Sequence, residues 1–280
     1  MIIWIASYPK SGNTWLRSLI SAYYYSKDGK FNFDLLENIH QYPSPIFIKN
    51  KIDKPGEVSR FWKSSQEEII QNNKIIFLKT HNANIFLDEN KFTTKKTAAG
   101  AIYIVRDPRN VISSLKNHYD LSNYNEAMKF MISDRKYIWD KRYKDDYSGF
   151  QFLGSWSNHY KSWKNTNDFK VYFLRYEDLE TDTENTESKL LKFINSLTNK
   201  NIRIDKKKLN SCIKSTSFNL LKKIESKYGF PENVGDDQNK KINFFHLGPN
   251  NNWKNLLPNK IKSVLNDIFE KELKELEYIN

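Results

Sequence analysis

The sequence is poor in cysteine: Cys212 is the one cysteine among 280 residues. An internal disulfide is therefore excluded, and no zinc-ligand pattern is visible in the chain. A chain of this length can bury a core large enough to fold without disulfides or metals. A single cysteine is also typical of proteins from a reducing compartment, so we expect a cytoplasmic location.

Long hydrophobic runs are also lacking. Residues 1–6 are apolar, but they carry no basic leader and are too short for a signal core or a membrane span. We therefore expect no membrane span, and we interpret residues 2–6 as a buried strand.

Acidic residues are fewer than basic ones, 33 against 45, and the formal net charge is +12. Such a balance favours a polyanionic partner: nucleic acid, an anionic membrane surface or a multiply phosphorylated small molecule. The excess is spread along the chain, without an arginine-rich arm or an aromatic RNA-binding motif. We therefore expect no nucleic-acid partner and assign most of the charge to a solvated lysine surface.

The chain shows neither an internal repeat nor a low-complexity linker, so we predict one domain over residues 1–280. Short runs rich in Ile, Val, Phe and Tyr, typical of strands buried on both faces, alternate with helical patterns. Strands are predicted at residues 2–6, 74–78, 101–105 and 170–174, and helices at 13–25, 107–119, 156–163, 183–197 and 258–276. The last helix would place five apolar side chains on one face: Ile261, Leu265, Ile268, Phe269 and Leu273.

This alternation predicts the α/β class, with a central parallel β-sheet flanked by helices in a three-layer, P-loop-like nucleotide-binding architecture. Ligands of such sheets bind at the carboxyl ends of the strands, near helix N-termini. The most informative polar segments, residues 7–15, 79–81 and 106–114, each follow one of the first three predicted strands. We therefore expect the functional site at this edge of the sheet.

The segment between the first strand and the first helix has the layout of a phosphate-binding loop. Gly12 permits a tight turn with positive φ, and the helix that follows begins with free N–H groups that favour an anion. Lys10 adds a positive charge, and Ser11 and Thr14 add hydroxyl groups. The spacing Gly-x-x-x-x-Gly-Lys of nucleoside triphosphatases is absent because Lys10 precedes Gly12, which disfavours hydrolysis of ATP or GTP.

The string Tyr-Pro-Lys-Ser-Gly-Asn-Thr-Trp at residues 8–15 resembles the 5′-phosphosulfate loop of the sulfotransferases that use 3′-phosphoadenosine 5′-phosphosulfate (PAPS). The pattern of that family is Tyr-Pro-Lys-Ser-Gly-Thr-Thr-Trp, and the chain differs at Asn13, whose amide can still donate hydrogen bonds. The resemblance implies a donor-binding role for Lys10, Ser11, Gly12, Asn13, Thr14 and Trp15.

The resemblance continues in two further segments. In the family, an Arg at a strand end and a Ser eight residues later bind the 3′-phosphate, and Arg106 and Ser114 have this spacing. Arginine suits phosphate because its guanidinium donates two parallel hydrogen bonds. The family's catalytic histidine follows Lys-Thr, which corresponds here to Lys79 and His81; an imidazole can accept a hydroxyl proton near neutral pH.

Later segments resemble the family's adenine and 3′-phosphate contacts. Tyr176, Thr216 and Phe218 correspond to residues that hold the adenine, and Trp15 and Phe218 would sandwich its ring. The family's late Arg-Lys-Gly segment, which grips the 3′-phosphate, corresponds to His246, Leu247 and Gly248. Backbone N–H groups at Gly248, or the side chain of Lys241, would then replace the two missing cations.

The mechanism that this resemblance implies is in-line sulfuryl transfer from PAPS to an acceptor hydroxyl, with adenosine 3′,5′-bisphosphate (PAP) as product. His81 would remove the hydroxyl proton, and Lys10 would stabilise charge on the bridging oxygen. Lys79 and Thr14 would hold sulfuryl or 5′-phosphate oxygens. No metal is implied, because cationic side chains take the place of Mg²⁺.

Three other functions remain open at this stage. They are a P-loop-type kinase of a small molecule, a non-catalytic polyanion-binding protein and a sulfotransferase-like scaffold without activity. The acceptor, a small-molecule or glycan hydroxyl, should contact the segments 41–62, 82–95, 133–152 and 228–244, whose aromatic and lysine content suits a phenol, a hydrophobic alcohol or a glycan. The family's C-terminal dimer motif is absent, which leaves the oligomeric state open.

Overall fold

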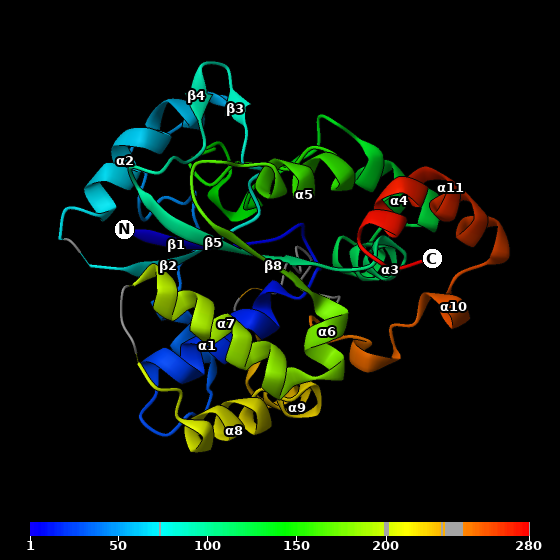
Figure 1. Ribbon diagram of the computed structural model, residues 1–280. Helices are drawn as coiled ribbons and strands as arrows, with labels where there is room; N and C mark the ends of the chain where they lie inside the picture. Colours follow the sequence, from blue (N-terminus) through cyan, green and yellow to red (C-terminus); the bar gives the residue numbers. More distant parts are fainter. Residues whose placement is uncertain (73, 199–201, 231, 233–242, 280) are drawn as a thin grey trace.

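The computed structural model describes residues 1–280 except 73, 199–201, 231, 233–242 and 280 (Figure 1). Four parallel strands form its central sheet in the order β2-β1-β5-β8. The bounds are β1 Ile2–Ala6, β2 Ile76–Thr80, β5 Ala98–Val105 and β8 Val171–Arg175. The prediction of a central parallel sheet flanked by helices is confirmed.

Helices cover both faces of this sheet (Figure 1). The α-helices are α1 Asn13–Tyr25, α2 Trp62–Ile69, α3 Pro108–His118, α4 Tyr124–Ile132, α5 Trp156–Lys164, α6 Tyr176–Thr181, α7 Thr183–Leu197, α8 Lys206–Ser215, α9 Phe218–Tyr228, α10 Trp253–Leu256 and α11 Asn259–Glu275. The 3₁₀ helices are η1 Phe33–Asn38, η2 Glu57–Phe61, η3 Lys141–Tyr143 and η4 Gly248–Asn250. Two small antiparallel ribbons pair β3 Phe86–Leu87 with β4 Asn90–Lys91, and β6 Tyr137–Ile138 with β7 Gln151–Phe152.

The first strand separates two hydrophobic cores. Ile2, Trp4 and Ala6 belong to the core that includes side chains of α2, α3, α5 and α11. Ile3 and Ile5 belong to the core that includes side chains of α1, α7 and α8. Successive side chains of a strand point to opposite faces, and therefore a wholly apolar strand is buried on both sides.

The strand and helix predictions differ from the structure mainly at the ends. The helices α1 and α7 begin and end as predicted. Strand β2 lies two residues later than predicted, because its pairing with β1 runs from Ile2–Ile76 to Ala6–Thr80 and includes the polar Lys79. The strand β5 begins earlier than predicted, at Ala98.

One predicted core residue is wrong. Ile268 is 41% exposed, whereas Leu265, Phe269 and Leu273 of the same helix are buried. The backbone of α11 is non-helical at Phe269, with φ −106° and ψ 15°. This kink changes the helical phase next to Ile268, so regular spacing does not give its orientation.

A buried carboxyl group lies in the core between α1, α7 and α8. Glu187 of α7 is 1% exposed, and neither of its carboxyl oxygens has a hydrogen-bond partner among the described residues. Burial raises the pKa of Glu187 to about 8. The folded protein therefore holds this proton at pH values where the unfolded chain has lost it, and stability falls as the pH rises from about 4.5 to about 8.

Replacing Glu187 with Gln removes this titration. We expect the difference in melting temperature between Glu187→Gln and wild type to be larger at about pH 9 than at about pH 5, by at least about 4 °C in favour of the variant, because only the wild type is destabilised as the pH rises. Thermal unfolding at a series of pH values measures the effect. Glu184→Gln, at an exposed glutamate of the same helix, is the control and should show no comparable change. A pH-independent difference for Glu187→Gln would contradict a buried neutral carboxyl.

Candidate functional site

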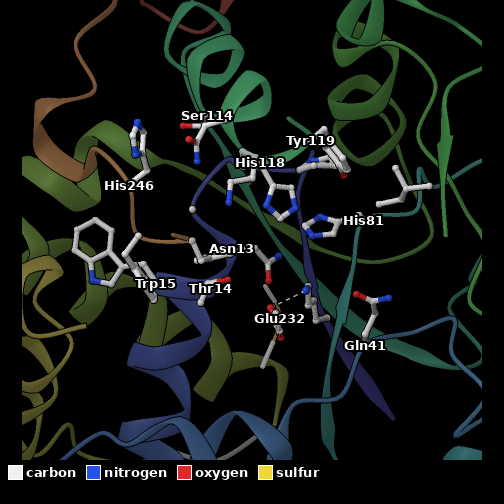
Figure 2. Close-up of a pocket in the computed structure, with 18 of the residues that line it drawn as sticks. Asn13, Thr14, Trp15, Gln41, His81, Ser114, His118, Tyr119, Glu232 and His246 are labelled. Carbon is white, nitrogen blue, oxygen red and sulfur yellow. Dashed lines mark hydrogen bonds and ion pairs between the residues drawn. The ribbon is translucent and has the colours of Figure 1, made fainter. Parts of the chain in front are cut away.

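A cavity of about 1200 Å³ opens at the carboxyl edge of the sheet (Figure 2). The parallel pairing of β1 with β2 and β5 brings three strand ends to this edge. Fourteen of the sequence-predicted site residues line the cavity: Lys10, Gly12, Asn13, Thr14, Trp15, Lys79, His81, Arg106, Ser114, Tyr176, Phe218, His246, Leu247 and Gly248.

Two of the predicted site residues do not line the cavity. Ser11 is fully buried, and its hydroxyl has no hydrogen-bond partner among the described residues. The hydroxyl of Thr216 donates to the carbonyl of Cys212 at 2.8 Å, one turn back along α8. Neither hydroxyl therefore faces this cavity.

The loop before α1 depends on glycine at one position. Gly12 has φ +101°, and a Cβ there would lie 2.5 Å from Cδ2 of the Tyr176 ring. The glycine thus allows both the turn and the close approach of Tyr176. Lys10 also has a positive φ of 66°, an uncommon conformation for a residue with a side chain.

Asn13 stabilises the loop from within. Its side-chain amide donates to the carbonyl of Ile5 and to the hydroxyl of Ser7, each at 3.2 Å. The sequence analysis assigned the amide of Asn13 to a ligand. In the structure this amide instead connects α1 with the end of β1.

The same loop orients His81. The Nδ1 atom of His81 lies 2.8 Å from the carbonyl oxygen of Ser7, which can only accept a hydrogen bond. Nδ1 therefore carries the proton, and Nε2 is left as the basic nitrogen. At the backbone, His81 donates to Gln151 Oε1 at 2.7 Å and accepts from Nε2 of His159 at 2.9 Å. The histidine is thus fixed by groups from several segments.

Positive charge and burial keep this histidine neutral. Burial lowers the pKa of His81 well below its usual value, and the charge of Lys79 lowers it further. A neutral imidazole is the form that can accept a proton.

Lys10 is the most perturbed cation of the loop. Burial, followed by repulsion from Lys79 and Arg106, lowers its pKa to about 7. Its Nζ lies 3.6 Å from the centre of the Phe244 ring, a favourable contact for a cation. Burial and the two neighbouring cations thus both disfavour the charged form of Lys10, and an anion bound nearby would favour it.

The residues predicted to bind the 3′-phosphate come from neighbouring elements. The guanidinium of Arg106 lies 3.9 Å from the centre of the Tyr176 ring, and its buried Nε has no partner among the described residues. Ser114 Oγ accepts a hydrogen bond from Asn251 Nδ2 at 2.9 Å. Asn251 therefore docks the segment that follows Gly248 against α3.

The late segment lies over the adenine-binding residues predicted from the sequence. A Cβ on Gly248 would lie 2.4 Å from the Phe218 ring, so this glycine permits the contact between η4 and α9. Trp15 packs edge-on against Tyr176, with ring centres 5.5 Å apart. Lys222, which the sequence did not single out, donates to the carbonyl of His246 at 3.1 Å. Lys241 lies outside the described residues.

Several residues of the site were missed by sequence reasoning. His118 lines the cavity, where burial and then the charges of Lys10 and Lys79 lower its pKa. Arg17 lies one helical turn after Thr14, a spacing that could have indicated it. Glu232 binds Arg17 and Lys79, and no local sequence pattern identifies it.

Aromatic side chains between residues 130 and 143 also line the cavity. Its lining includes Phe130, Tyr137, Trp139 and Tyr143, together with Lys136. Three of the segments expected to contact an acceptor contribute described lining residues, namely 41–62, 133–152 and 228–244. Segment 82–95 contributes none among the described residues, because it continues past His81 into the β3–β4 ribbon.

Within the described part of the chain, no group of three or more His, Cys, Asp or Glu side chains is arranged to hold a metal ion. Among the same residues, no helix is both long enough and apolar enough to cross a membrane.

The fold and the cavity define an α/β protein in which several cations and a histidine line a cavity at the carboxyl edge of the sheet. A family model, described as the sulfotransferase domain, matches residues 2–277. The chain therefore belongs to the sulfotransferase domain family and is a transferase enzyme of that family. Family membership favours this activity over the kinase and polyanion-binding alternatives.

The chain is similar to proteins from animals and plants. Sulfotransferase 1B1 of Canis lupus familiaris is 26% identical over 273 residues, which cover 96% of this chain and 82% of the relative. A flavonol sulfotransferase-like protein of Flaveria bidentis is 24% identical over 280 residues, which cover 97% of this chain and 81% of the relative.

Solved structures share the fold. Mouse sulfotransferase SULT7A1 complexed with PAP superposes with a TM-score of 0.59 at 22% identity, covering 98% of this chain and 84% of that chain. Retinol dehydratase in a complex with retinol and PAP superposes with a TM-score of 0.62 at 16% identity, covering 98% and 81%. Both likenesses support the α/β architecture described above.

Gly12 provides a direct test of the loop. Gly12→Ala should weaken binding of PAP at least about tenfold, because the new methyl group meets both positive φ and the Tyr176 ring. Isothermal titration calorimetry with PAP measures the loss. Gly149→Ala is the matched control, since its Cβ would find no atom nearer than 3.9 Å. Equal PAP affinity in Gly12→Ala and wild type would show that the loop conformation is not required.

Proposed function

We propose that this chain transfers a sulfuryl group from PAPS to an acceptor hydroxyl by in-line displacement, with His81 as the general base. One observation carries the proposal: the hydrogen bond from Nδ1 of His81 to the Ser7 carbonyl leaves Nε2 as the basic nitrogen in a cavity that also holds Lys10 and Lys79. The presence of PAP in the solved structures of related fold supports PAPS as donor.

The described residues fit such a donor. Gly12 lines the cavity directly before a helix whose first N–H groups favour an anion. The buried Nε of Arg106 has no partner within the part of the chain that the structure describes, and it is suited to an oxygen of the 3′-phosphate. Ser114, His246 and the backbone at Gly248 complete the proposed contacts at that end, and Tyr176, Trp15 and Phe218 those around the adenine.

PAPS supplies the activated sulfuryl group when it is bound. The chain's own contribution is to position the reactants and to stabilise charge. Nε2 of His81 takes the proton of the acceptor hydroxyl. Lys10 stabilises negative charge on the bridging oxygen, and Lys79 and Thr14 hold the neighbouring oxygens. The lowered pKa of His81 keeps it in the basic form before the reaction.

The acceptor is proposed to be a small molecule with a hydroxyl group that binds next to the aromatic lining residues. Phe130, Tyr137, Trp139 and Tyr143 offer flat apolar surface, which suits a phenol or a hydrophobic alcohol. A glycan would also bind aromatic faces, with Lys136 available for a polar group. The cytoplasmic location expected from the sequence is part of the same proposal.

The donor is tested by calorimetry with PAP and with adenosine 5′-monophosphate, which lacks the 3′-phosphate. We expect PAP to bind at least about tenfold more tightly, because a charged hydrogen bond to phosphate is worth about 1.5–3 kcal/mol. Arg106→Met should remove most of this preference. Equal affinity of the wild type for the two nucleotides would contradict a site for the 3′-phosphate.

The general base is tested by His81→Ala. Turnover of PAPS with an accepted hydroxyl substrate should fall by about 10²–10⁴-fold, while PAP affinity stays within about threefold of wild type. His40→Ala is the control, because His40 is exposed and does not line the cavity. Turnover of His81→Ala within about twofold of wild type would remove this residue from the mechanism.

A further inference from the structure

Glu232 lines the cavity (Figure 2) and forms an ion-pair triad with Lys79, another lining residue, and with Arg17 of α1. One carboxylate oxygen of Glu232 lies 2.5 Å from Nη1 of Arg17, and the other lies 3.1 Å from Nζ of Lys79. The three residues come from distant parts of the sequence, since Glu232 follows Arg17 by 215 residues and Lys79 by 153. Their contact is therefore a product of the tertiary fold.

Arg17 forms the fixed end of this triad. Its side chain is 3% exposed, and Nη2 donates to the carbonyl oxygens of Leu36 and Ile39 at 3.4 and 3.1 Å. A guanidinium held by two backbone carbonyls has little freedom to move. Glu232 compensates its charge and is thereby held in one place.

Lys79 is the end that faces the site. Its backbone pairs with β1 and also bonds to His40 and Tyr42, so the strand directs the side chain into the cavity. The side chain is 9% exposed, and its ammonium donates to Glu232. Among the described residues, Glu232 uses one of the three ammonium hydrogens, which leaves two for oxygens of a ligand.

The surroundings of Lys79 are otherwise unfavourable for a positive charge. Burial lowers the pKa of Lys79, whereas Glu232 raises it. The other titratable or charged groups around this part of the cavity are of three kinds. The cations are Arg17 from α1, Lys10 from the loop, Arg106 after β5 and Arg142 from η3, and the histidines are His81 after β2, His118 from α3 and His159 from α5. The carboxylates are Asp140, which pairs with Arg142, and Glu225 from α9, which accepts from the backbone N–H groups of Phe244 and Phe245. Glu232 is the carboxylate that bonds to Lys79 itself, and it therefore favours the charged lysine.

We propose that Glu232 is a positioning residue, which holds Lys79 charged and directed at the point of sulfuryl transfer. The inference rests on the proposed function, because it takes Lys79 as a contact of the reacting group. The triad contains two cations and one carboxylate. The charge of Arg17 offsets that of Glu232, and the charge of Lys79 is therefore the net positive charge of the triad. The triad therefore presents one fixed cation to the transferred group.

Two other roles for Glu232 are less consistent with the geometry. As a competing anion it would have to leave when the donor binds, but its departure would strand the buried Arg17 without a counter-charge, which is strongly destabilising. As a general base, Glu232 would need a pKa close enough to neutral pH to take up a proton during the reaction. Burial alone would raise the pKa of Glu232, but the charges of Arg17 and Lys79 outweigh burial and hold this pKa well below its usual value.

The experiment begins with the wild-type protein, its PAP affinity by calorimetry and its turnover as a function of pH. Glu232→Gln keeps the size of the side chain and removes its charge. We expect kcat near neutral pH to fall about tenfold and the alkaline limb of the kcat profile to move down by about one pH unit, because Lys79 loses its proton more readily. PAP lacks the sulfuryl group, so its affinity should stay within about threefold.

Two further variants separate positioning from folding. Asp168→Asn is the matched control, since Asp168 is a carboxylate with the same 29% exposure that pairs with Lys91 at 2.7 Å, outside this cavity. It should leave the pH profile and PAP affinity unchanged. Glu232→Asp retains the charge and should restore the alkaline limb to its wild-type position.

Three results would overturn the inference. Tighter PAP binding by Glu232→Gln with unchanged kcat would identify Glu232 as a competing anion. A fall in melting temperature, with kcat and PAP affinity reduced together and an unshifted pH profile, would identify a structural role. Unchanged kcat and pH profile in an active enzyme would remove Glu232 from the reaction.

A wild-type protein that neither binds PAP nor turns over PAPS would instead refute the proposed function.

Discussion

The concentration of positive charge at the carboxyl edge of the sheet is the constraint on which the rest of this site depends. Arg17, Lys79 and Arg106 are buried there, and Lys10 is partly buried beside them. Burial, followed by repulsion from neighbouring cations, lowers the pKa of both lysines. Each cation has a compensating neighbour: the ring of Phe244 for Lys10, the ring of Tyr176 for Arg106, and Glu232 for the other two. Anionic ligands complement the remaining charge.

The same charge controls the chemistry available to histidine. Cations and burial keep His81 unprotonated, and the Ser7 carbonyl selects the nitrogen that stays basic. A ligand anion next to Lys79 would offset the repulsion that lowers the pKa of His81 and would make proton uptake easier. In the proposed mechanism, donor binding and proton transfer would therefore be coupled through the charge of Lys79.

The sequence predicted the elements that depend on local patterns. Short runs rich in Ile, Val, Phe and Tyr identified all four strands of the central sheet. The 8–15 loop, the 79–81 segment and the Arg106–Ser114 pair, which the sequence placed at one edge of that sheet, each contribute residues to one cavity. The exact ends of β2 and β5 depend on pairing with β1, which no local pattern records. The exposure of Ile268 depends on a kink within α11, where regular spacing fails.

The contacts that the sequence could not give are those between distant segments. Glu232 forms ion pairs with Arg17 and Lys79, which precede it by 215 and 153 residues, and Asn251 donates a hydrogen bond to Ser114. The hydroxyls of Ser11 and Thr216 match the family pattern but turn away from the cavity, because side-chain direction is set by packing around each residue. Asn13 is the reverse case: its amide, a departure from the family pattern, stabilises the loop itself.

The central claim is sulfuryl transfer from PAPS to a hydroxyl group, and product analysis tests it most directly. The purified protein would be incubated with PAPS and a panel of phenols, hydrophobic alcohols and glycans, and the products identified by mass spectrometry. The account predicts a sulfate ester of at least one acceptor, formed in equal amount with PAP. Absence of any sulfated product, together with phosphorylation of the same acceptors from ATP and Mg²⁺, would contradict it.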